Sequence, residues 1–303
     1  MLERNPKTSF RWDPLNQIKL HPLMNTSSGS PNVVIGLIDG PVDLTHPAFQ
    51  DSRIRTAIDS QIIACKAADS AACTHGTFVA GILCAKRGLP APAICPDCQL
   101  ILCPIFTNDS KIKGTIFPSS TPEELSKAII QTVNAGARII NLSVGLSASS
   151  LTSYHELEEA YNYAKQRDVI IVTASGNQGR IGHNPLINHP WIIPVVACDE
   201  QGRPTSESNL GPSMRNRGLM APGVNITSAS PGRRYTSMSG TSVAAPFVSG
   251  AIALLWSEFP NATAAEIKHS IIIAAAAKHH HSIIPPLLNA EKALQILKTL
   301  KNA

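Results

Sequence analysis

The amino-acid sequence predicts a three-layer α/β fold, with a mostly parallel central sheet and helices on both faces. Short apolar runs of strand length alternate with longer stretches in which apolar residues recur at helical spacing. Strands that alternate with helices form a parallel sheet covered on both sides. The 303 residues include 43% apolar residues and contain no internal repeat. We therefore expect one domain over residues 32–303, preceded by a polar arm over residues 1–31.

Five apolar runs are predicted to be strands, because each is short and bounded by polar or turn-forming residues. The first run ends in a carboxylate, Asp39, directly before Gly40. The predicted strands are 32–39, 99–106, 138–143, 168–174 and 191–198. Sites of open α/β sheets lie at the carboxyl ends of the strands, so polar residues that follow these runs are candidate site residues.

The predicted helices carry recognisable start signals. Thr121 precedes Pro122 and two acidic residues, which gives a capping hydroxyl, a proline at the first helical position and negative charge in the first turn. Thr74 is the corresponding N-cap candidate for a second helix. The predicted helices are 74–84, 121–136, 154–167, 241–259, 263–277 and 287–300.

Three short motifs carry candidate catalytic residues in the order Asp39, His75, Ser242. Taken singly, they have ordinary interpretations as a turn residue, a packing residue and an N-cap. Together they match a chemical need, because a serine hydroxyl is a weak nucleophile that requires a base. A neutral imidazole takes its proton, and a buried carboxylate orients the imidazole. We predict that Ser242 is the nucleophile, His75 the general base and Asp39 the orienting carboxylate.

Asn177 is the candidate donor for the oxyanion that forms when the nucleophile attacks a carbonyl. It lies in the segment Ala174-Ser-Gly-Asn177, directly after a predicted strand. Alone, this segment would be interpreted as a polar turn. Beside a catalytic triad, a side-chain amide favours an oxyanion hole, together with backbone N–H groups at the start of the helix that carries Ser242.

The motifs LIDG, THGTFVAG, NLSVG, ASGNQG and SGTSVAAPFVSG together resemble the subtilase family of serine peptidases over roughly residues 30–265. The resemblance implies a subtilisin-like fold and serine endopeptidase activity, with Asp39, His75, Ser242 and Asn177 as catalytic residues. It also implies that Ser143-Val144-Gly145 is the strand that pairs with the substrate backbone. The helix after His75 lacks the loop insertion that holds calcium in secreted relatives. No metal or other cofactor is therefore expected.

Several stretches in the second half resemble the cyanobactin (patellamide-type) maturation proteases. Among them are HPWIIPVVACD at 189–199, RGLMAPGVNITS at 217–228 and AIALLWSEFP at 251–260. The resemblance implies leader removal from a ribosomally made precursor peptide in the cytoplasm, with other maturation enzymes as candidate partners. The charged N-terminus lacks the apolar region of a secretory signal, and no apolar run is long enough to cross a bilayer. A cytoplasmic location without a membrane partner is therefore expected.

Other functions are weighed against leader removal. A macrocyclase of the same family would carry a helical insertion between Asp and His that shields the acyl-enzyme from water. The interval of 36 positions between Asp39 and His75 leaves little room for it and favours hydrolysis. A general cytoplasmic subtilase remains an alternative, whereas a peptide-binding pseudoprotease would lack a triad member. The net charge of +5 comes without a basic run or reading motif, so nucleic acid is not an expected partner.

Seven cysteines are present, and six of them lie between Cys65 and Cys103. In a chain without a secretory signal we expect mostly reduced, buried thiols. Cys95 and Cys98 are spaced for a local disulfide or for half of a zinc site, but the second CxxC pair of such a site is missing. A single disulfide within residues 65–103 is favoured over zinc.

Overall fold

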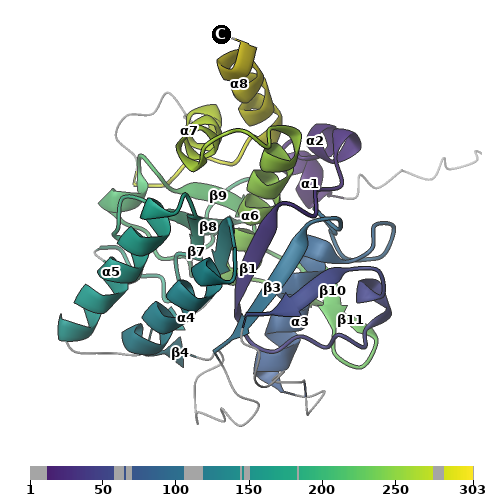
Figure 1. Ribbon diagram of the computed structural model, residues 1–303, viewed down its shortest axis with the longest axis horizontal. Helices are drawn as coiled ribbons and strands as arrows, with labels where there is room; N and C mark the ends of the chain where they lie inside the picture. Colours follow the sequence, from purple (N-terminus) through teal and green to yellow (C-terminus); the bar gives the residue numbers. More distant parts are fainter. Residues whose placement is uncertain are drawn as a thin grey trace, which may run out of the picture.

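The computed structural model describes residues 12–57, 65, 70–105, 119–143, 145–146, 151–182, 184–275 and 283–302. Its centre is a seven-stranded sheet in the order β2-β3-β1-β5-β7-β8-β9, in which each neighbouring pair is parallel (Figure 1). The strands are β1 Val34–Asp39, β2 Arg53–Thr56, β3 Gln99–Pro104, β5 Ile139–Leu142, β7 Ile170–Ala174, β8 Ile193–Cys198 and β9 Leu219–Pro222. The predicted α/β fold is thus confirmed.

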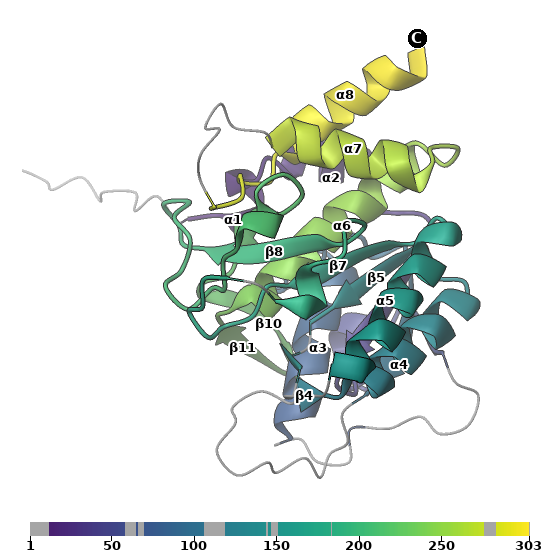
Figure 2. The ribbon, with the colours of Figure 1, turned by 90° about the vertical axis from the view of Figure 1, so that its left-hand side faces the viewer.

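Helices cover both faces of this sheet. Figures 1 and 2 show α4 and α5 side by side on one face, with α3 and α6 on the other. Each face encloses its own cluster of buried apolar side chains. The helices are α1 Pro14–Gln17, α2 His21–Thr26, α3 Ala71–Cys84, α4 Pro122–Asn134, α5 Leu151–Gln166, α6 Thr241–Glu258, α7 Ala264–Ala275 and α8 Ala290–Asn302, and the 3-10 turns are η1 Pro47–Phe49, η2 Pro185–Ile187 and η3 Pro212–Met214.

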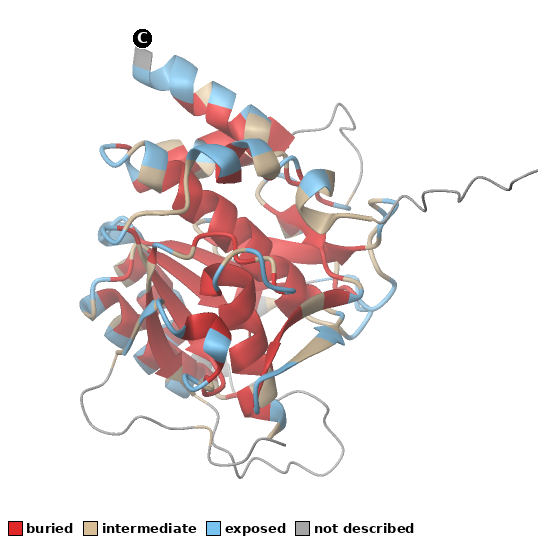
Figure 3. Ribbon diagram, turned by 90° about the vertical axis from the view of Figure 1, so that its right-hand side faces the viewer, coloured by how far each residue is buried: buried red, intermediate tan, exposed pale blue. Residues whose placement is uncertain are grey.

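The strand order reverses direction at β1, which pairs with β3 on one side and with β5 on the other. Such a switch point leaves a crevice at the carboxyl ends of the strands, where α/β proteins place their sites. Asp39 is the last residue of β1 and therefore lies at this crevice. Residues 241–256 of α6 are all buried, and Figure 3 shows that buried residues fill the centre of the molecule.

Two predicted helix starts have different outcomes. The expected cap of α4 is confirmed as a reciprocal capping box: Glu124 N–H donates to Thr121 Oγ1 at 3.2 Å, and Thr121 N–H donates to Glu124 Oε2 at 2.9 Å. The expected cap at Thr74 is wrong, because α3 begins at Ala71 and Ser70 Oγ accepts from Cys73 N–H. His75 therefore lies inside α3 and not at its first residue.

Residues 12–31 differ from the polar arm that the sequence predicts. They form α1 and α2, and they bury Ile18, Leu20 and Leu23 completely in the core. The Ile18 carbonyl accepts a hydrogen bond from Ala290 N–H at 3.0 Å, which joins this segment to the start of α8. Pro22 and the polar residues between these three apolar positions obscured the helical spacing. The described part of the arm is packed on the domain, and the boundary at residue 32 stays a prediction.

A hairpin that the sequence did not predict leads into the Ser242 helix. Strands β10 Ile226–Ser230 and β11 Arg234–Met238 pair in antiparallel register. Gly240 N–H donates to the Gly223 carbonyl at 2.8 Å, so the hairpin brings the chain back to the point where it left β9. This closure fixes where α6 begins. A further short parallel pair joins β4 Ser119–Ser120 to β6 Gly145–Leu146.

The cysteines agree with the single disulfide favoured for residues 65–103. Cys65 and Cys73 are bonded to each other, and the disulfide joins the segment before α3 to the first turn of that helix. The other five cysteines are free and buried. In the part of the chain that the structure describes, no three His, Cys, Asp or Glu side chains form a metal-binding group. Within the same ranges, no helix combines the length and apolar character needed to cross a bilayer.

Candidate active site

The structure brings Asp39, His75 and Ser242 into contact, although they are 36 and 167 positions apart in the chain. His75 Nδ1 lies 2.7 Å from Asp39 Oδ1, and His75 Nε2 lies 2.9 Å from Ser242 Oγ. All three side chains are buried. With the proton on Nδ1, His75 donates to the carboxylate and leaves Nε2 free to accept the hydrogen of the serine hydroxyl. This is the geometry of a serine nucleophile with its base and orienting acid.

Close backbone packing holds Asp39 against the helix of His75. A Cβ at Gly40 would lie 2.0 Å from the Ala72 carbonyl oxygen, and a Cβ at Gly76 would lie 2.3 Å from the Gly40 carbonyl oxygen. Only glycine permits this approach of α3 to the end of β1. Gly40 N–H also donates to Asp39 Oδ1 at 2.6 Å, which fixes the carboxylate that faces His75.

Two opposing effects set the pKa of His75. Burial disfavours the charged imidazolium and lowers the pKa, whereas the charge of Asp39 and its hydrogen bond raise it. The two contributions from Asp39 together prevail, and the pKa lies above the ordinary 6.5. Asp39 therefore favours the charged form of the imidazole.

Asn177 lies in the loop that follows β7, beside the start of α6. Its Oδ1 accepts from Thr241 N–H at 2.9 Å and from the Thr241 hydroxyl at 3.0 Å. Because the oxygen is held by Thr241, the amide Nδ2 is the group directed toward Gly240, where an added Cβ would lie 3.1 Å from it. Gly240 has a φ of +142°, which favours glycine and leaves the space beside Nδ2 free of a side chain. An oxyanion-hole amide needs such a space.

We expect Asn177→Ala to lower kcat for peptide cleavage by about 10²–10³-fold with little change in KM, the loss seen when one oxyanion donor is removed. The physical reason is that Nδ2 stabilises charge that develops only in the transition state. Steady-state kinetics on a peptide substrate would measure this. A rise in KM at unchanged kcat would contradict the assigned role.

Ser143, predicted to bind substrate, has a side chain that faces the interior. Its hydroxyl donates to the Ser242 carbonyl at 3.2 Å and accepts from Asn141 Nδ2 at 2.8 Å. Ser249 in turn donates to Asn141 Oδ1 at 2.8 Å. These buried hydrogen bonds attach β5 to the first turns of α6. A substrate contact of Ser143 would thus involve its backbone.

The other two residues of the predicted substrate strand have separate outcomes. Val144 lies outside the described residues. Gly145 belongs to β6 and pairs with Ser119 of β4. Sequence reasoning missed Asn141, Ser249 and Thr241 as residues that support the site. Each of them is a polar residue that adjoins or interrupts an apolar run, and this sequence pattern could have identified them.

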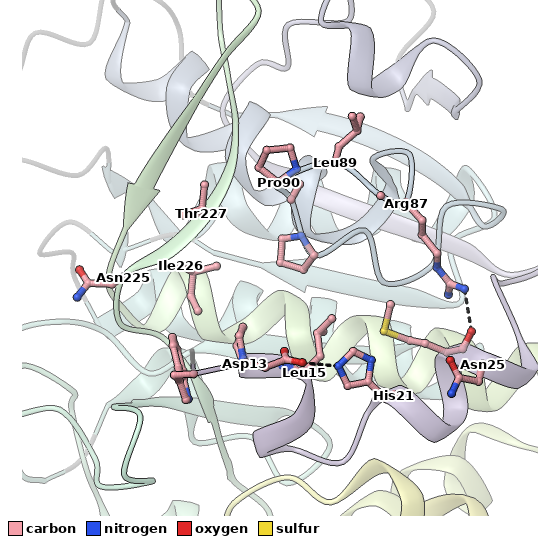
Figure 4. Close-up of a pocket in the computed structure, with 16 residues that line it drawn as sticks. Asp13, Leu15, His21, Asn25, Arg87, Leu89, Pro90, Asn225, Ile226 and Thr227 are labelled. Carbon is pink, nitrogen blue, oxygen red and sulfur yellow. Dashed lines mark hydrogen bonds and ion pairs between the residues drawn. The ribbon is translucent and has the colours of Figure 1, made fainter. Parts of the chain in front are cut away.

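A separate cavity of about 890 Å³ lies between α1, α2, the turn after α3 and the start of β10 (Figure 4). Arg87 on its wall lies beyond the carboxyl end of α3, whereas His75 lies in the first half of that helix. The nine helical steps from His75 to Cys84 span about 14 Å of helix. This cavity is therefore distinct from the crevice of the triad.

An Asp–His–Ser series in this chain order, at the crevice of a parallel α/β sheet, defines the subtilisin type of serine peptidase site. The chain belongs to the peptidase S8 (subtilase) family, whose model matches residues 30–293.

Two curated relatives illustrate the similarity. A thermophilic serine proteinase of Bacillus sp. (strain AK1) is 32% identical over 262 residues, which is 85% of this chain and 57% of the relative. A thermostable alkaline protease of Halalkalibacterium halodurans is 33% identical over 198 residues, which is 65% of this chain and 51% of the relative. The chain thus spans little more than half the length of these two relatives.

Solved structures are similar over more of their length. The solved structure of the patellamide maturation protease PatA is 32% identical with a TM-score of 0.73, and the match covers 89% of this chain and 98% of the solved chain. The prenylagaramide maturation protease PagA is 29% identical with a TM-score of 0.77, covering 92% and 98%. The PatG macrocyclase domain has a TM-score of 0.77 at 20% identity, with 93% and 96% covered, which shows a shared fold alone.

Proposed function

We propose that this chain is a serine endopeptidase that cleaves a ribosomally made precursor peptide and removes its leader. The observation that carries the peptidase proposal is the hydrogen-bonded series Asp39–His75–Ser242, with distances of 2.7 Å and 2.9 Å. In the proposed reaction His75 Nε2 takes the hydroxyl proton while Ser242 Oγ attacks the peptide carbonyl. Asn177 Nδ2 donates to the oxyanion that forms.

The second half of the reaction returns the same groups to their starting state. His75 gives its proton to the leaving amine, and the peptide bond breaks to leave an acyl-enzyme on Ser242. A water molecule then gives a proton to His75 Nε2 as its oxygen attacks the ester carbonyl. The ester bond breaks, and His75 returns that proton to Ser242 Oγ as the carboxylic acid product leaves.

The substrate part of the proposal is supported by PatA and PagA, which are described as maturation proteases and match this chain over about nine-tenths of its length. Hydrolysis is preferred to cyclisation because of the short interval between Asp39 and His75. In the described part of that interval, the elements are η1, β2 and the first turn of α3. An acyl-enzyme without a covering insertion is open to water.

A cytoplasmic location and other maturation enzymes as partners belong to the same proposal. The five free, buried cysteines fit a reducing compartment. The Cys65–Cys73 disulfide is a bond that reducing compartments disfavour. The location therefore stays a prediction. Intact-mass analysis of alkylated cell extracts would check it by showing whether Cys65 and Cys73 are reduced in the cell.

The test is to incubate the protein with linear peptides that join a leader to a core, and to read the products by mass spectrometry. We expect two linear fragments whose summed mass exceeds that of the substrate by one water. A core product lighter than its linear form by one water would instead identify a macrocyclase. Equal digestion of an unrelated unfolded protein would favour a general protease, and no cleavage of any peptide would contradict the peptidase proposal.

A further inference from the structure

We infer that Asn209 is a positioning residue that fixes the oxyanion loop, residues 174–182, so that Asn177 points at the reacting carbonyl. The inference rests on the proposed peptidase function and adds a residue to it. Asn209 lies in the segment between β8 and β9, is 6% exposed, and belongs to none of the motifs used to find the catalytic residues.

The side chain of Asn209 holds the residues that follow Asn177. Its Oδ1 accepts from the backbone N–H groups of Gln178 at 3.2 Å and Arg180 at 2.9 Å. Its Nδ2 donates to Gln178 Oε1 at 2.7 Å. Both polar atoms of this amide thus form hydrogen bonds to the loop. An asparagine is suited to this task because it presents an acceptor and a donor on one planar group.

The backbone of Asn209 holds the residue that precedes Asn177. Asn209 N–H donates to the Gly176 carbonyl at 2.9 Å. Gly176 has a φ of +100°, and an added Cβ there would lie 2.4 Å from Asn209 Nδ2. The absence of a side chain at residue 176 is therefore what allows the asparagine to approach this closely. Asn209 contacts the neighbours of Asn177 on both sides.

Asn177 is consequently held from two directions. Thr241 binds its Oδ1 and also accepts from Gly176 N–H at 3.2 Å, whereas Asn209 fixes the backbone around it. Removing the Asn209 side chain leaves the loop attached through backbone bonds, among them the Leu210 N–H to Arg180 carbonyl bond of 2.8 Å and the Asn209 N–H to Gly176 carbonyl bond of 2.9 Å. The N–H groups of Gln178 and Arg180 lose their acceptor, so the backbone after Asn177 is less firmly fixed. A displacement of about 1 Å at a catalytic group can cost about 10²-fold in rate.

The test is a double-mutant cycle between Asn209→Ala and Asn177→Ala, with kcat and KM measured on a peptide that the wild type cleaves. We expect Asn209→Ala to lower kcat by about 10- to 100-fold with KM within about twofold. In the Asn177→Ala background the same substitution should change kcat by less than about twofold, because its effect acts through the amide already removed.

Ser208→Ala is the matched control in the same segment. Its hydroxyl accepts from Ala197 N–H on β8 at 3.2 Å and does not contact the oxyanion loop. We expect its kcat to stay within about twofold of wild type, since it loosens the segment without freeing Asn177. A loss equal to that of Asn209→Ala would mean that Asn209 is merely structural.

A second variant keeps the test decisive if Asn209→Ala does not fold. Gln178→Ala removes only the exposed acceptor of Asn209 Nδ2, and we expect a smaller loss of kcat that also disappears in the Asn177→Ala background. Equal losses in both backgrounds, or unchanged kcat in Asn209→Ala, would overturn the inference. Failure of the wild type to cleave any peptide would instead overturn the proposed function.

Discussion

Replacing Ser242 with alanine is expected to lower kcat for peptide cleavage by about 10⁶-fold, the loss measured for the nucleophile of subtilisin itself. Ser242 Oγ lies 2.9 Å from His75 Nε2. Alanine has no oxygen at this position and cannot form an acyl-enzyme. Initial rates from quantitative mass spectrometry of the products would measure the loss. Cleavage by Ser242→Ala within about tenfold of wild type would contradict the central proposal.

Ser270→Ala is a matched control for this substitution. Ser270 is a buried serine on α7 whose hydroxyl donates to the Ile267 carbonyl at 2.8 Å, as an ordinary helical serine does. Its loss should leave kcat unchanged. His75→Ala should match Ser242→Ala, and the double variant should be no worse than either, because the two groups act as a unit.

The candidate catalytic residues could be identified from the sequence because each lies in a short motif. Asp39, His75 and Ser242 follow or open elements whose apolar patterns are clear, and their chain order is informative. The residues that support them could not be predicted in the same way. Asn209 is 31 positions from Gln178, and Ser249 is 108 positions from Asn141. Such contacts arise from the packing of segments that no local pattern links.

Some strands could be predicted from their local sequence pattern, whereas others are defined by packing against their neighbours. Strands β1, β5, β7 and β8 lie in the middle of the sheet, so their near-continuous apolar runs reflect burial on both faces. The edge strand β2, Arg53–Thr56, has an alternating, partly exposed pattern, and the hairpin strand β11 is largely polar. These elements were missed because backbone pairing with neighbours defines them, and their side chains carry little apolar signal.

Asp39→Asn is expected to lower kcat by about 10⁴-fold while leaving the packing of the site intact. An amide at residue 39 no longer carries the charge that stabilises the His75 imidazolium, and its NH₂ group favours the wrong tautomer of the imidazole. Steady-state kinetics would measure the loss, and a decrease below about tenfold would contradict the role of Asp39.

The same variant makes the pH profile informative. Catalysis needs neutral His75, so kcat/KM of the wild type should rise as pH increases through the pKa of His75, which Asp39 holds above 6.5. In Asp39→Asn only the effect of burial remains, and burial lowers this pKa. The rise in the residual activity should therefore shift to lower pH. An unchanged midpoint would mean that Asp39 does not set the basicity of His75, and the carboxylate would then act through orientation alone.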